Sequence, residues 1–330
     1  MKEFSIYHPE IPDFLRAAAD TPPMQRLKAV GMNCGCEYTS FPRFDRCAPY
    51  SRYDHSLGVA LIVWHFTASP AQALAGLFHD IATPAFSHVV DFLRGDHLTQ
   101  ESTEDGTTEL IDGSPEIQSV LRSLGLTTED VCDYHRYPIA DNDAPRLSAD
   151  RLEYSLGNLM QFGFADVRTV KTIYDDLTVG ENEDGAPELA FRSEATARQF
   201  AHGALRCSEV YVSDEDRYAM QMLAELLGNA IEKGVLTEND LSRTEPEVIA
   251  RLRADAAFAR RWERFCGYRE ILAADRPGND GDWRVIPAKK RRIDPLILGR
   301  GRTSACDPAF GEKLLKFLQM PQDYWVCGRP

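Results

Sequence analysis

An adjacent histidine and aspartate, His79 and Asp80, lie within a run of small and apolar residues at positions 75–82. This pair constrains the fold most, because burying a charged group without a partner costs several kcal/mol of lost solvation. A divalent metal ion is the natural partner of a neighbouring imidazole and carboxylate. We therefore expect further ligands on other helices, and His55 and Asp150 are the candidates.

The segments around these four residues resemble the HD superfamily of metal-dependent phosphohydrolases, and most closely its deoxynucleotide triphosphohydrolase branch. The resemblance covers roughly residues 20–160 and is weaker up to about 235; its motifs lie at residues 21–27, 41–42, 52–59, 77–81, 84–88 and 150–154. It implies a mostly α-helical HD-domain bundle. It also implies that His55, His79, Asp80 and Asp150 hold one divalent ion, and this ligand set accepts Mn, Fe, Ni, Zn or Mg.

The resemblance implies roles for five further residues. Arg52 and Arg151 would bind phosphate, and Tyr154 would line the sugar site. His88 and Asp91 would lie beside the scissile phosphate, where such a pair can move protons or hold the attacking water. The alternatives are surface arginines, a core tyrosine and an exposed His–Asp pair.

The chain also departs from the pattern of this branch. Thr83 stands where the triphosphohydrolases have a second histidine and monophosphate-specific relatives have a glutamate, and Asn158 stands where an aspartate is expected near the sugar. The usual His-Glu block is not clear at His97 and Glu101 or at 104–105. Two hypotheses therefore stay open. The chain is either a nucleotide phosphohydrolase or a catalytically weakened nucleotide sensor or assembly protein.

For the enzyme, deoxynucleoside triphosphates are the first expected substrates, and nucleoside monophosphates or alarmones the second. The formal net charge of −14 makes nucleic acid and membranes unlikely partners. Residues 26–52 reverse this balance with five basic and two acidic residues, which suits a phosphorylated substrate. The resemblance implies a homodimer or larger homo-oligomer.

The start of the chain does not resemble a signal peptide, and no apolar run is long enough to span a bilayer. The eight cysteines include no CxxC pair, which indicates reduced thiols. We therefore expect a cytoplasmic protein.

We expect a lead-in at 1–20, an HD domain at 21–235 and a helical extension at 236–330 that could contain a small sheet. Helices are predicted at 13–19, 24–30, 53–66, from Ser69 to Asp80, and at 86–93, 107–113, 115–124, 127–134, 150–162, 189–210, 214–233 and, in two pieces, 238–264. The acidic stretch 175–188 is interpreted as a solvated loop. His135 could be an extra metal ligand or structural, and the basic cluster 289–292 is interpreted as a solvated face rather than a nucleotide contact.

Overall fold

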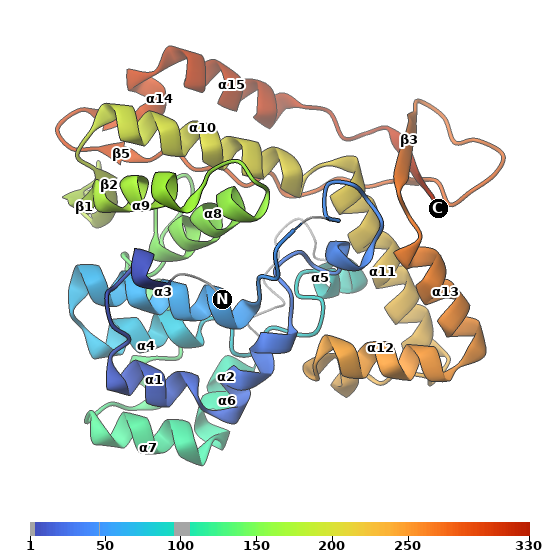
Figure 1. Cartoon of the computed structure of the whole chain (residues 1–330), viewed down its shortest axis with the longest axis horizontal. Helices are drawn as coiled ribbons and strands as arrows, with labels where there is room; N and C mark the ends of the chain where they lie inside the picture. The colour runs from blue at the N-terminus through green and yellow to red at the C-terminus, as the bar shows by residue number, and fades with distance from the viewer. Residues whose placement is uncertain (1–3, 46, 96–105) are drawn as a thin grey trace.

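The computed structural model describes residues 4–45, 47–95 and 106–330, which form fifteen α-helices and two small β-sheets (Figure 1). The prediction of a mostly helical chain is confirmed. The strands are more extensive than expected, because one of the two sheets begins within the predicted HD domain, in a stretch interpreted as a loop. In the described part of the chain, no helix is both long enough and apolar enough to cross a membrane.

Two packed helices carry the His-Asp pair. Helix α3 (Arg52–Thr67) begins with a capping box between Ser51 and Asp54, and α4 (Pro70–Phe78) begins at the cap Ser69. A Cβ atom on Gly76 would lie 3.2 Å from Val59 Cγ1, so the glycine permits close packing of the two helices. Both predicted helices are confirmed, although α4 ends at Phe78 and leaves His79 and Asp80 in the turn after it.

The first core surrounds α3 and α4 (Figure 1). Thr21 occupies the N-cap position of α2, but its hydroxyl donates to Ala18 O and makes no cap bond. The helix predicted at 127–134 is wrong, because only the 3₁₀ turns Thr128–Asp130 and Tyr134–Arg136 form near it. Helices that contribute to this core are α1 (Asp13–Ala19), α2 (Pro22–Arg26), α6 (Thr107–Gly113), α7 (Pro115–Ser123), α8 (Ala149–Gln161), α9 (Val167–Asp175) and α10 (Glu194–Tyr211).

The acidic stretch is not a solvated loop. Its residues form the antiparallel hairpin β1 (Leu177–Glu181) and β2 (Pro187–Phe191), and Glu188 is fully buried. In the turn, Asn182 Oδ1 accepts hydrogen bonds from the backbone N–H groups of Asp184 and Ala186. The predicted helix 189–210 therefore begins later, at Glu194, where α10 starts.

The second core lies beside the first, and its helices α11 to α13 are yellow to orange in Figure 1. Its helices are α5 (Val89–Arg94), α11 (Asp214–Glu232), α12 (Glu245–Ala254) and α13 (Ala256–Cys266). A three-stranded sheet adjoins them, with β7 (Trp325–Arg329) between β3 (Glu270–Ala274) and β4 (Arg284–Val285), both antiparallel to it. The expected small C-terminal sheet is thus present.

The chain returns to the first core through residues 286–294, which we call the strap. After the strap, β5 (Leu296–Ile297) pairs in parallel with β2, and β6 (Gly301–Arg302) pairs with β5. Helices α14 (Thr303–Cys306) and α15 (Pro308–Gln319) follow and pack beside α10 (Figure 1). Because segments distant in sequence share each core, the domain limits at residues 20 and 235 remain predictions.

Candidate metal centre

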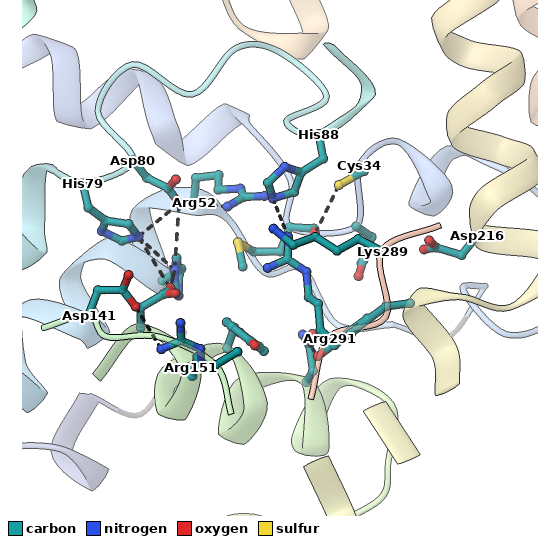
Figure 2. Close-up of a pocket in the computed structure, with 18 of the residues that line it drawn as sticks. Cys34, Arg52, His79, Asp80, His88, Asp141, Arg151, Asp216, Lys289 and Arg291 are labelled. Carbon is teal, nitrogen blue, oxygen red and sulfur yellow. Dashed lines mark hydrogen bonds and ion pairs between the residues drawn. The ribbon is translucent and has the colours of Figure 1, made fainter. Parts of the chain in front are cut away.

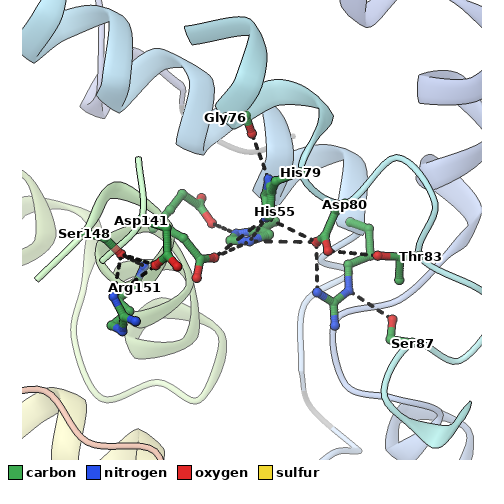
Figure 3. Close-up of polar contacts among 12 residues, drawn as sticks. His55, Gly76, His79, Asp80, Thr83, Ser87, Asp141, Ser148 and Arg151 are labelled. Atoms are coloured by element: carbon green, nitrogen blue, oxygen red, sulfur yellow. Dashed lines mark hydrogen bonds and ion pairs between the residues drawn. The ribbon is translucent and has the colours of Figure 1, made fainter. Parts of the chain in front are cut away.

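Four predicted ligands meet between α3, the end of α4 and the start of α8 (Figure 3). His55 Nε2 and His79 Nε2 lie 3.2 Å apart. Asp80 Oδ2 lies 3.9 Å from the first nitrogen and 3.6 Å from the second, and Asp150 Oδ1 lies 3.0 Å and 3.8 Å from them. The structure therefore brings together all four residues of the predicted ligand set.

The outer nitrogen of each imidazole has its own acceptor. His55 Nδ1 lies 2.6 Å from Glu153 Oε2, and His79 Nδ1 lies 2.8 Å from Gly76 O. A hydrogen on each Nδ1 leaves the Nε2 lone pairs free to face each other, which is the tautomer that a metal ligand requires. Glu153 is one turn after Asp150 on α8 and also accepts hydrogen bonds from the hydroxyls of Tyr7 and Tyr50.

Asp80 is held by two donors from outside the cluster. Arg52 Nη1 donates to its Oδ2 at 2.9 Å, and Thr83 Oγ1 donates to its Oδ1 at 2.8 Å (Figure 3). Arg52 Nε also donates to Ser87 Oγ at 3.0 Å. Arg52 is buried in the cavity wall and is not a surface arginine. Thr83 thus orients a predicted metal ligand.

The pKa values of the cluster are shifted because carboxylates and cationic groups lie close together in it. Burial lowers the pKa of His55, but hydrogen bonds to Asp150 and Glu153 outweigh burial and raise it to about 9. Burial opposes ionisation of Asp80, yet Arg52 and the two histidines hold its pKa well below the usual range. Hydrogen bonding to His55 lowers the pKa of Asp150 in the same way despite burial. The raised pKa of His55 shows that the surrounding carboxylates favour a positive charge at this place.

These residues fit a divalent ion. Two imidazole nitrogens and two carboxylates converge, and the donor atoms of His55, His79 and Asp80 all lie within 4.8 Å of one another. The facing Nε2 atoms would repel each other without a shared proton or cation between them. A metal ion would displace that proton, since ligating histidines must be neutral at the bound nitrogen.

A cavity of about 660 Å³ opens beside the cluster (Figure 2). His88 lines it, with Nδ1 2.8 Å from Oδ2 of the fully buried Asp91 and Nε2 3.3 Å from Arg291 Nη2. Burial lowers the pKa of His88 despite its bond to Asp91, and the positive charges of Arg291 and Arg52 add to that effect. The pair is therefore not exposed, and its neutral imidazole faces the cavity.

Arg151 and Tyr154 also line the cavity, as the sequence predicts for substrate contacts. Arg151 Nη1 lies 3.0 Å from Asp141 Oδ1 and donates to Asn142 Oδ1 at 2.9 Å. His135 Nδ1 lies 2.9 Å from Asp141 Oδ2, and its half-exposed ring is not part of the metal cluster. The roles assigned to Arg151 and Tyr154 remain predictions.

Sequence reasoning missed several residues of the site. Lys289 and Arg291, interpreted as part of a solvated face, line the cavity wall. Glu153 and Asp141 were also missed, although the position of Glu153 one turn after Asp150 is a detectable signal. The eroded block at His97, Glu101 and 104–105 lies outside the described residues.

No model of a known protein family matches the chain. The chain is 28% identical over 233 residues to the uncharacterized protein YdhJ of Bacillus subtilis (strain 168), an alignment that covers 70% of this chain and 68% of that protein. It is 24% identical over 271 residues to the metal-dependent phosphohydrolase cns2 of the organism Cordyceps militaris, covering 76% of this chain and 72% of that protein. Together with the histidine and aspartate cluster, this similarity supports a metal-dependent phosphohydrolase.

Proposed function

We propose that this protein is an HD-type metal-dependent phosphohydrolase that acts on nucleotides. The observation that carries the proposal is the convergence of two imidazoles and two carboxylates, with both Nδ1 atoms held by outer acceptors, beside a cavity lined by arginine and lysine. The similarity to a protein named a metal-dependent phosphohydrolase supports the same reaction class.

The side chains around the cluster have separate tasks in this proposal. When bound, a divalent ion would activate a water molecule and neutralise charge on the phosphoryl oxygens. His55, His79, Asp80 and Asp150 would hold that ion. His88 is oriented by Asp91 through Nδ1, so its Nε2 can hold the attacking water or accept a proton from it.

The rest of the cavity suits a nucleoside. Its volume falls in the range of pockets that bind ligands of this size. Tyr154, Phe162 and Tyr211 line it and offer aromatic surfaces for a sugar or base. Asn158 donates to the Tyr211 hydroxyl, and its buried Oδ1 has no hydrogen-bond partner among the described residues, so it can accept from a ligand hydroxyl or amine. Deoxynucleoside triphosphates are the first substrates to test, and monophosphates and alarmones the second.

The test is phosphate release from a panel of these nucleotides with added manganese, comparing wild type with Asp80→Ala. Asp175→Ala is the matched control, because it removes a carboxylate from an exposed helix end. We expect turnover in wild type and the control, and its loss in Asp80→Ala. Release of tripolyphosphate or of orthophosphate identifies the subclass.

A nucleotide sensor or assembly role is the second candidate. Thr83 favours it, because Thr83 stands where the triphosphohydrolases have a second histidine. Its hydroxyl cannot act as that histidine would, and it donates a hydrogen bond to Asp80. Bound metal without turnover of any nucleotide would contradict the enzyme and support the sensor.

A further inference from the structure

The strap crosses the side of the cavity that lies away from the metal cluster. Lys289 and Arg291 extend from it into the cavity toward His88 (Figure 2). The strap thus supplies two cations from a part of the chain that is far in sequence from the metal ligands.

The strap is fixed at both ends. Ile286 O accepts a hydrogen bond from the buried Arg217 at 2.6 Å, and Asp294 N donates to Pro145 O at 2.8 Å. Between them, Lys290 Nζ donates to Leu318 O at 2.7 Å, on the side away from the cavity. Lys289 and Arg291, the residues on either side of Lys290, both line the cavity.

Arg291 contacts a residue that the proposed reaction uses. Its Nη2 lies 3.3 Å from His88 Nε2, and its guanidinium carbon lies 6.0 Å from the centre of the Tyr154 ring. An arginine in this place can reach an anion bound next to His88 while it still rests against the aromatic wall.

The charge distribution of the cavity supports an anion at this place. Arg52 and Arg151, the other arginines of the described wall, add to its positive charge, although each lies against a carboxylate, Asp80 and Asp141. Asp216 lines the cavity near the strap, and burial raises its pKa to about 8, so it is mainly protonated at neutral pH and repels an anion little.

We infer that Lys289 and Arg291 form a second phosphate subsite, which binds a phosphate group of the substrate beyond the one at the metal. The inference rests on the proposed function and deepens it. Substrates with a chain of two or more phosphates bind more tightly because of this subsite, and nucleoside monophosphates do not. Arg291 is a specificity-determining residue, and it leaves His88 Nε2 when it binds the second phosphate.

Calorimetry with the metal-loaded full chain tests the subsite without turnover. The probes are inorganic tripolyphosphate, saturated beforehand with manganese, and inorganic phosphate. In the double variant Lys289→Ala and Arg291→Ala we expect tripolyphosphate to bind about 10-fold or more weakly, since each charge-assisted contact to phosphate is lost. Inorganic phosphate should bind as in wild type.

Arg292→Ala is the matched control, because it removes an exposed arginine from the same strap. It should bind both probes as wild type does. Equal tripolyphosphate affinity in wild type and the double variant, or no tripolyphosphate binding by wild type, overturns the subsite.

Kinetics separate this inference from the proposed function. In Arg291→Ala we expect KM for nucleoside triphosphates to rise about 10-fold while KM for monophosphates stays unchanged. If Arg291→Ala changes KM equally for triphosphates and for monophosphates, the subsite is overturned and the proposed hydrolase stands. Absence of turnover in wild type, with tripolyphosphate binding still dependent on the strap, overturns the enzyme and supports the subsite.

Discussion

At the scale of single residues, Thr83 orients the predicted metal ligand Asp80 without itself being a predicted ligand. Its side chain is fully buried, and its hydroxyl donates to Asp80 Oδ1 at 2.8 Å. Partners of this kind fix the geometry of the ligand they touch, and their loss commonly lowers metal affinity by about 10- to 100-fold.

We therefore predict that Thr83→Val, which keeps the shape and removes the hydroxyl, weakens manganese binding about 10-fold. Thr83→Ser keeps the hydroxyl and is the matched control. Calorimetric titration with manganese measures both variants. Wild-type affinity in the valine variant would show that the hydroxyl does not support Asp80.

At the same scale, residue patterns identified the predicted metal ligands but not the two cations of the strap. His55, His79, Asp80 and Asp150 are recognisable because histidine and aspartate are costly inside apolar helical segments unless they share a partner. The interpretation of residues 289–292 as a solvated face did not foresee that Lys289 and Arg291 line a cavity, because a run of basic residues carries no information about which of them faces it.

At the scale of elements, the β1–β2 hairpin connects the C-terminal strands to the metal centre. Arg302 of β6 makes two hydrogen bonds to the carboxylate of Glu188, at 2.6 Å and 2.8 Å. Glu188 Oε1 also accepts from Leu147 N at 3.1 Å, immediately before the cap of α8. Because α8 carries Asp150, the hairpin supports a predicted metal ligand from outside the helical core.

We predict that Glu188→Ala lowers the free energy of unfolding by about 3 kcal/mol, since it leaves a half-buried arginine without its main partner. Glu183→Ala is the control, because the exposed Glu183 also contacts Arg302 and its loss should cost less than about 1 kcal/mol. Urea denaturation measures both variants. Equal effects of the two substitutions would contradict the structural role of Glu188.

Element prediction succeeded where local signals decide the structure. The predicted helices 13–19 and 53–66 and the predicted start at Ser69 agree with α1, α3 and α4 within one position at their starts, because apolar spacing and the Ser-Pro start signal are local. The hairpin was missed because its acid-rich sequence suggested solvent exposure. The buried carboxylate of Glu188 has its partner in Arg302, which lies 114 positions later in the chain.

At the scale of the whole molecule, the second core buries carboxyl groups that resist ionisation. Burial raises the pKa of Asp216 to about 8, and burial together with the charge of Glu245 raises that of Glu37 to about 8. Between about pH 4 and pH 8 the folded chain therefore holds protons at these carboxyls that the unfolded chain releases. Their contribution to stability falls as the pH rises through this range.

We predict that Asp216→Asn makes stability less dependent on pH, because an amide has no proton to release. Relative to wild type, the variant should gain stability as the pH rises from about 6 to about 9, measured by urea denaturation at both values. Glu209→Gln, at an exposed position of α10, is the control and should follow the wild-type profile. If the stability of Asp216→Asn changed with pH in parallel with that of wild type, Asp216 would ionise normally in the folded protein.

The sequence by itself determined the helical class and the four predicted metal ligands, because helix periodicity, caps and costly buried polar residues are local properties of the chain. It also indicated His88 and Asp91 as a pair, since three positions apart on one helical turn places them together.

Only the tertiary structure decided which groups support those ligands and which cations face the substrate cavity. Glu153 reaches His55 across 98 positions, and Arg291 reaches His88 across 203. Such contacts depend on how helices and the strap cross in space, and no local pattern of residues encodes that crossing. The physical reason is that packing of distant surfaces, rather than local backbone preference, selects the partners of each buried charge.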